Sequence, residues 1–284
     1  MTRFAPTFAA LLAVACWGGA ALGQFNTGAP LAEHRFLAGW WMQRESGTVN
    51  MSGIQVKLAE GWKTYWRAPG EFGLPPRLEL VEQSNVARLQ MHFPRPSVFI
   101  DNGMRTIGYA DEVVFPIEII PFDHMQPARA NLLLHLGVCM NVCVPVTLEV
   151  PFQVFPGHHR NAKAIEVALS KNPVRVDTSD PKGRAACNID MSGSGKGYRI
   201  TYEFDYDGKI GPRTAAVFES SGDPIWFSDA LLHQQHSGRL SAIAQMNFFG
   251  DGMAIFRRSN LRVTLISGQD YIEFVGCNEN LTVR

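Results

Sequence analysis

Cysteines are the residues of this 284-residue chain best suited to covalent chemistry, and there are five of them. Cys139 and Cys143 stand close together in the run Cys-Met-Asn-Val-Cys. In a straight strand their Cα atoms would lie roughly 13 Å apart, whereas a disulfide needs less than about 7 Å. We therefore expect a tight turn that brings the two sulfurs together at the tip of a hairpin.

The short loop between these cysteines indicates what a disulfide there would do. Closing a loop of about five residues stabilises a fold by about 2 kcal/mol, against about 4.6 kcal/mol for about ninety residues. A Cys139–Cys143 bond is thus a weak clip, and small, exposed disulfides are typical of redox pairs. A structural hairpin clip, two unrelated thiols and a metal site are the alternatives. The hairpin shows no obvious basic residue beside the cysteines.

Cys187 and Cys277 form the second expected pair. Cys187 alternates with Ile189 and Met191, and Cys277 alternates with Val275, so both cysteines should point inward from strands. A bridge between them would close a long loop, where the entropic gain is large. We interpret this pair as a structural disulfide, with a second exchange site as the alternative.

The first residues predict a secretory signal peptide. Arg3 supplies a positive charge, residues 8–22 are apolar, and a small-residue pattern ends at Gly23. The apolar run is shorter than the ~20 residues that cross a bilayer. Cleavage near Gly23 would remove Cys16 and release a soluble protein into a disulfide-permissive compartment, with no membrane span left. An uncleaved anchor and lipidation at Cys16 are the alternatives.

The elements that must position these cysteines are mostly strands. Apolar residues alternate over 131–138 and 146–152, on both sides of the hairpin, and again over 198–206. A helical pattern covers 158–172, where Asn-Pro stops it, and a brief helix is expected over 228–236. Helices and strands do not alternate, so a parallel α/β sheet is not expected.

The strand pattern predicts an all-β chain of two antiparallel β-sandwich domains joined by a short helix or linker. We expect the signal peptide over 1–23, a first domain over 24–157, a helical linker over 158–172 and a second domain over 173–284. The 26 basic and 26 acidic residues give no net charge, which speaks against a nucleic-acid partner. With 46% hydrophobic residues, the chain is not expected to be disordered.

Three further segments, together with the cysteine hairpin, resemble a known family. They are Ala-Glu-Gly-Trp-Lys-Thr-Tyr-Trp-Arg-Ala-Pro-Gly over 59–70, Phe-Pro-Arg-Pro over 93–96, an Ile-Gly-Tyr element over 107–117, and the cysteine hairpin over 138–145. In this order they are similar to the N-terminal periplasmic (alpha) domain of the thiol:disulfide interchange protein DsbD, and closer still to its relatives linked to copper tolerance. The second half resembles the second β-domain of those longer relatives only loosely.

The resemblance implies an immunoglobulin-like fold and thiol–disulfide exchange without a cofactor. The family's exchanging pair maps onto Cys139 and Cys143, and its aromatic-bearing cap loop maps onto 97–106, where Phe99 is the only aromatic residue. The implied role is a periplasmic protein-disulfide reductase. It would take electrons from a membrane-embedded thiol reductant (DsbD- or CcdA-like) and pass them to thioredoxin-fold proteins, including those of cytochrome c biogenesis.

Two departures from the family matter. The family's cysteine spacing is wider than the one here, and the chain stops at Arg284 without a membrane or thioredoxin domain. A separate membrane donor is therefore expected.

Three aromatic residues outside the cap loop could surround the pair. Trp62, Tyr65 and Tyr109 are read either as a docking rim or as sandwich core. The main rival function is a copper-binding protein or chaperone, because Met140 and His135 would add soft ligands to the cysteines, although we expect no resident metal. A non-catalytic assembly or adhesion sandwich is the third alternative.

Overall fold

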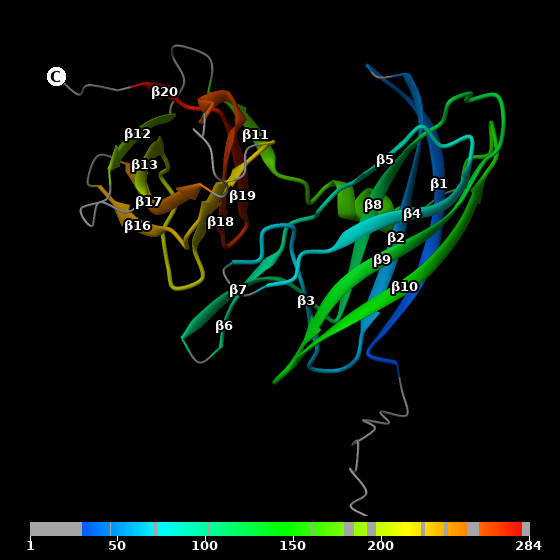
Figure 1. Ribbon diagram of the computed structural model, residues 1–284, viewed down its shortest axis with the longest axis horizontal. Helices are drawn as coiled ribbons and strands as arrows, with labels where there is room; N and C mark the ends of the chain where they lie inside the picture. The colour runs from blue at the N-terminus through cyan, green and yellow to red at the C-terminus, as the bar shows by residue number, and fades with distance from the viewer. Residues whose placement is uncertain are drawn as a thin grey trace, which may run out of the picture.

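Strands dominate the chain in the computed structural model (Figure 1). The structure describes residues 30–279 except 46, 71–72, 102, 161, 179–184, 192–196, 223–224, 236–237 and 249–255. The expected signal peptide lies outside these residues. None of the helices within them is long and apolar enough to cross a membrane.

The first ten strands form a two-sheet unit that we call the N-terminal sandwich. One sheet has the order β1-β2-β8-β5, and the other has the order β10-β9-β3-β7-β6 with β4 also paired to β9. All their pairings are antiparallel. The bounds are β1 Ala32–Arg44, β2 Gly47–Leu58, β3 Lys63–Tyr65, β4 Arg77–Ser84, β5 Arg88–Met91, β6 Ser97–Asp101, β7 Met104–Ala110, β8 Glu112–Ile120, β9 Ala128–Cys139 and β10 Cys143–Val154.

The alternation of apolar residues sets the register of the long β9–β10 hairpin. Leu132, Leu134 and Leu136 of β9 are buried, and Leu148 and Val150 of β10 join the same core. A shift by one residue would turn each of these side chains to the other face, so the hydrophobic pattern fixes the pairing. The strands expected over 131–138 and 146–152 are confirmed.

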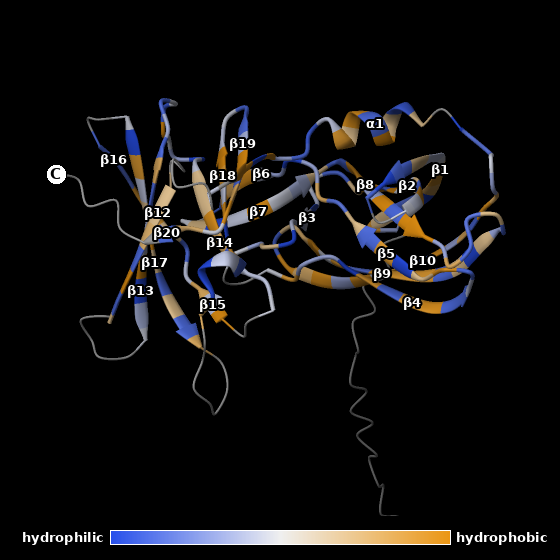
Figure 2. Cartoon of the chain, turned by 90° about the horizontal axis from the view of Figure 1, so that it is seen from above, coloured by the Kyte–Doolittle hydropathy of each residue, from blue (hydrophilic) through white to orange (hydrophobic). Residues whose placement is uncertain are grey.

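Helix α1 (Lys163–Leu169) is shorter than the expected helical linker over 158–172 and lies beside β8 and β2 (Figure 2). Its buried residues, Ile165 and Ala168, pack with Met51 and Val114. These contacts hold the connection against the outside of the N-terminal sandwich.

The remaining strands form the C-terminal sandwich. Its sheets have the orders β11-β19-β18-β14 and β15-β17-β13-β12-β20, with β16 also paired to β17. The β11–β19 and β12–β20 pairs are parallel, so this sandwich is not purely antiparallel. The bounds are β11 Val174–Asp177, β12 Ala185–Met191, β13 Tyr198–Asp205, β14 Ala215–Ser220, β15 Ile225–Phe227, β16 Leu231–Gln234, β17 Arg239–Phe248, β18 Leu261–Ser267, β19 Asp270–Val275 and β20 Asn278–Glu279.

The strand expected over 198–206 is β13 and is confirmed. The brief helix expected over 228–236 is wrong, because residues 231–234 form strand β16 on β17. Pairing with a neighbouring strand satisfies the backbone there better than one isolated helical turn would.

The Cys187–Cys277 disulfide closes the C-terminal sandwich. It joins residues 90 positions apart, and their Cα atoms lie 5.6 Å from each other. Cys187 is 3% exposed and lies in the core of this sandwich. The Tyr202 hydroxyl donates a hydrogen bond to the Gly276 carbonyl, which fixes the chain just before Cys277. This buried position agrees with the expected structural pairing.

A buried ion cluster joins the two sandwiches. Arg67, which follows β3, donates hydrogen bonds to Glu219 on β14 at 2.8 Å and to Glu273 on β19 at 2.7 Å. Glu273 is fully buried and also lies within ion-pair distance of Arg175 and Arg262. Burial by itself lowers the pKa of Arg67, but the hydrogen bond and charge of Glu219 outweigh that effect and raise it. The interface therefore contains paired charges beside apolar contacts such as that of Trp66 with Tyr271.

Replacing Glu273 by Gln is expected to weaken this joint. The change keeps the shape of the side chain but leaves Arg67, Arg175 and Arg262 beside an uncharged group. Removing one partner from a buried ion pair costs about 3–5 kcal/mol. Urea unfolding should show a loss of that size, whereas Glu149→Gln on exposed β10 should change the free energy of unfolding by less than about 0.5 kcal/mol. Equal midpoints for the two variants would contradict this.

Candidate redox site

The site is built at the tip of the β9–β10 hairpin. Cys139 ends β9, Cys143 begins β10, and the two residues face each other in the strand register. The Met140 amide donates a hydrogen bond to the Val142 carbonyl at 3.1 Å, which closes the turn. The Cα atoms of the cysteines are 4.1 Å apart and their sulfurs form a disulfide. The turn expected from the spacing is thus confirmed.

The tip of the hairpin is open to solvent. Cys143 is exposed and Cys139 is half-buried. The intervening Met140 and Val142 are 53% and 64% exposed, which is high for apolar residues. A partner protein can therefore reach this disulfide, and it would meet Cys143 more readily than Cys139.

Tyr65 on β3 contacts both sulfurs. Its hydroxyl lies 3.1 Å from Cys143 Sγ and 3.1 Å from Cys139 Sγ. Disulfide sulfurs carry no proton, so the tyrosine is the donor. Burial raises the pKa of Tyr65, which keeps the hydroxyl protonated at neutral pH.

Two neighbours place the Tyr65 ring. A Cβ atom at Gly137 would meet that ring at 3.0 Å, so a larger residue would crowd it. The Thr64 hydroxyl donates a hydrogen bond to the Gly137 carbonyl at 2.9 Å, which fixes β3 against β9. These contacts fix the position of β3 on β9, and from this position the Tyr65 hydroxyl reaches the disulfide.

Lys63 supplies a basic residue that sequence reasoning missed. It pairs directly with Cys139 in the register between β3 and β9, and opposed residues carry their side chains on the same face of a sheet. Its ammonium lies 2.7 Å from Asp101 Oδ2 and 4.6 Å from the centre of the Phe99 ring. No signal near the cysteines could reveal it, because the pairing joins distant parts of the chain.

The structure divides the expected aromatic neighbours. Phe99 lies on β6, in a β6–β7 hairpin that occupies the expected cap loop. Its ring contacts the ammonium of Lys63, which in turn lies opposite Cys139. Trp62 is half-buried against the N-terminal core. Tyr109 is 7% exposed and its hydroxyl donates to the Pro94 carbonyl, which places it in the sandwich core, the second of the two interpretations given for it.

His135 does not join the cysteines as the copper alternative would require. The described residues contain no group of three or more His, Cys, Asp or Glu side chains that could hold a metal. The two ring nitrogens of His135 lie 3.1 Å from the Thr147 hydroxyl and 3.0 Å from the Glu79 carboxylate. Its imidazole is thus engaged away from the cysteines.

Comparison with known proteins agrees with the expected resemblance. Residues 35–153 match the family of the thiol:disulfide interchange protein DsbD, N-terminal, and this range contains β3 and the hairpin. The crystal structure of the N-terminal periplasmic domain of ScsB from Proteus mirabilis superposes with a TM-score of 0.62 at 23% identity, covering 89% of this chain and 96% of that one. This likeness shows a common fold across both sandwiches. Among curated proteins, no sequence matches.

Removing the Tyr65 hydroxyl should alter the reduced site without harming the fold. After reduction, the hydroxyl can donate to a thiolate, and a hydrogen bond to a charged group contributes about 1.5–3 kcal/mol. Tyr65→Phe should therefore raise the lower thiol pKa by about one or more, measured from the pH dependence of iodoacetamide alkylation. Tyr198→Phe, an exposed tyrosine of the C-terminal sandwich, is the control. An unchanged alkylation profile in Tyr65→Phe would count against a direct hydrogen bond.

Lys63→Met should also raise the thiol pKa, because a nearby cation favours the thiolate. The effect should shrink at high salt, since half-exposed charges are screened. Asp101→Asn should act in the opposite direction, because it frees the ammonium from its carboxylate partner. Alkylation rates across pH would measure both variants, with Lys57→Met on β2 as the control. Parallel shifts in Lys63→Met and Asp101→Asn would contradict this arrangement.

Proposed function

Residues 35–153 of this chain match the DsbD N-terminal family, and from that premise we propose that the protein carries out thiol–disulfide exchange through Cys139 and Cys143. The observation that carries the proposal is the contact of the Tyr65 hydroxyl with both sulfurs at an exposed hairpin tip. A donor placed there can stabilise whichever sulfur carries negative charge during exchange.

The reaction begins from the reduced pair. The Cys143 thiolate attacks a sulfur of the partner's disulfide, the partner's S–S bond breaks, and a mixed disulfide forms. The released partner thiolate takes up a proton. Cys139 then loses its proton and attacks Cys143 Sγ, which breaks the mixed disulfide and frees the second partner thiolate. Two electrons pass to the partner, and the Cys139–Cys143 bond is restored.

The exposure of the two cysteines supports this order of attack. Cys143 is exposed, so it can meet a partner sulfur, and half-buried Cys139 stands beside it to resolve the intermediate. Tyr65 contacts both positions and can donate to either thiolate. Lys63 lies on the Cys139 side of the site, where it favours deprotonation of the resolving thiol.

The match to the DsbD N-terminal family supports a proposal for the electron source and acceptors. The chain would act as a periplasmic protein-disulfide reductase that a membrane-embedded thiol reductant returns to the dithiol form. Its acceptors would be periplasmic thioredoxin-fold proteins, including those that serve cytochrome c biogenesis. The exposed apolar tip around Met140 and Val142 supports this role, because apolar residues at a contact centre favour protein partners.

Trapping tests the proposed roles of the two cysteines. In Cys139→Ala the mixed disulfide at Cys143 cannot be resolved, so it should accumulate with an oxidised thioredoxin-fold protein as a reductant-sensitive band on a non-reducing gel. The reduced Cys143→Ala variant should trap several-fold less, because its remaining thiol is half-buried. Trapping by neither variant would refute exchange at this pair, and stronger trapping by Cys143→Ala would reverse the roles.

A further inference from the structure

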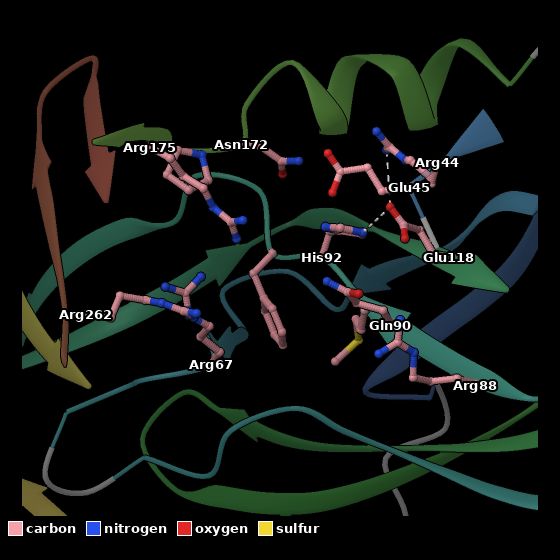
Figure 3. A pocket seen from close by; sticks show the side chains of 13 residues that line it. Arg44, Glu45, Arg67, Arg88, Gln90, His92, Glu118, Asn172, Arg175 and Arg262 are labelled. Carbon is pink, nitrogen blue, oxygen red and sulfur yellow. Dashed lines mark ion pairs between the residues drawn. The ribbon is translucent and has the colours of Figure 1, made fainter. Parts of the chain in front are cut away.

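A cavity of about 710 Å³ lies between the two sandwiches (Figure 3), and no residue of the cysteine hairpin over 138–145 lines it. Residues from β1, β5 and β8 line it on the N-terminal side, the linker after α1 crosses its rim, and β11 and β18 contribute from the C-terminal sandwich. Five arginines line it, against two glutamates: Arg44, Arg67, Arg88, Arg175 and Arg262, with Glu45 and Glu118.

The charges are unevenly placed around this cavity. Figure 3 shows Arg67, Arg175 and Arg262 together on one side, whereas Glu45 and Glu118 lie with Arg44 on the other. Arg44 pairs with Glu118 at 3.2 Å. The two glutamates of the lining therefore lie at the end where Arg44 already neutralises part of their charge. At the other end, Arg67, Arg175 and Arg262 form a wall without a glutamate among the lining residues.

The three-arginine wall keeps an excess of positive charge. Its only acidic partners among the described residues are Glu219 and Glu273, so three guanidinium groups share two carboxylates. Glu273 is fully buried behind the wall and does not line the cavity. The carboxylates hold the arginines in place, and one positive charge remains uncompensated at the surface of the cavity.

Arg175 has the most exposed side chain of this wall. Arg175 reaches Glu273 through Nε, and its side chain is still 69% exposed, so its terminal nitrogens are free to bind. Arg262 Nε is buried and lies 3.5 Å from Glu273 Oε2, so this atom faces the carboxylate, and Arg262 lines the cavity with the rest of its side chain, which is 30% exposed.

His92 lies between the two ends of the cavity (Figure 3). Its Nε2 is buried and lies 3.2 Å from Glu118 Oε1. Burial lowers the pKa of His92, while Glu118 opposes that effect and Arg44 and Arg175 add to it. The imidazole is therefore neutral at neutral pH and adds no positive charge to the cavity. Phe93 and Met91 add apolar side chains to the lining of the cavity.

We infer that this interdomain cavity binds a phosphate group, either as free inorganic phosphate or as a small phosphomonoester, held by Arg67, Arg175 and Arg262. Guanidinium groups match phosphate oxygens with paired N–H donors, and several arginines together favour a multiply charged oxyanion. The apolar side chains of Met91 and Phe93 in the lining can contact the organic part of a phosphomonoester. This site is independent of the cysteine chemistry.

Titration calorimetry at low ionic strength tests the site, with inorganic phosphate in one arm and glycerol 3-phosphate in the other. Arg175→Gln should weaken binding by at least about tenfold, because a hydrogen bond to a charged group is lost. The Arg175 side chain is largely exposed, so this variant should fold, and Arg199→Gln on β13 should bind like the parent protein.

The two arms separate the sources of the phosphate group. Tighter binding of glycerol 3-phosphate would assign the site to a phosphomonoester, whereas equal binding would assign it to free phosphate. Absence of binding heat for both ligands at millimolar concentration would overturn the inference. Equal affinities of Arg175→Gln and Arg199→Gln would overturn it as well.

Discussion

The docking of strand β3 against β9 is the interaction on which the rest of the structure depends. Its three residues have separate tasks: Thr64 ties the strand to Gly137, while Lys63 and Tyr65 point to the face that carries the disulfide. The next two residues lead from the strand toward the C-terminal sandwich. Trp66 is fully buried, and Arg67 lies in the interface between the sandwiches. One short segment thus connects the reactive hairpin to the joint between the sandwiches.

The two disulfides illustrate how position decides what the same bond can do. Cys187–Cys277 spans 90 residues inside a core, where it restricts the unfolded chain and is shielded from partners. Cys139–Cys143 spans four positions at an exposed turn, where it restricts little and is accessible. These positions support the proposed roles, in which the first bond stabilises the fold and the second takes part in exchange.

Local patterns in the sequence are enough to predict the hairpin but not its surroundings. Alternating leucines on β9 and the short cysteine spacing lead directly to two strands and a turn. The neighbours of the disulfide come from β3, more than seventy residues earlier, so Lys63 could not be identified from the cysteine run. Tyr109 shares the family-like Ile-Gly-Tyr element, yet sequence could not separate core from surface there. The strand at 231–234 was missed because its pairing with β17 overrides a weak local preference for helix.

The central claim is that Cys139–Cys143 exchanges while Cys187–Cys277 does not, and differential alkylation tests it most directly. The oxidised protein would be equilibrated with a reduced thioredoxin-fold protein, quenched with acid, alkylated and analysed by peptide mass spectrometry. The account predicts that Cys139 and Cys143 become alkylated together while Cys187 and Cys277 remain bonded. Reduction of both disulfides in parallel, or of Cys187–Cys277 first, would contradict it.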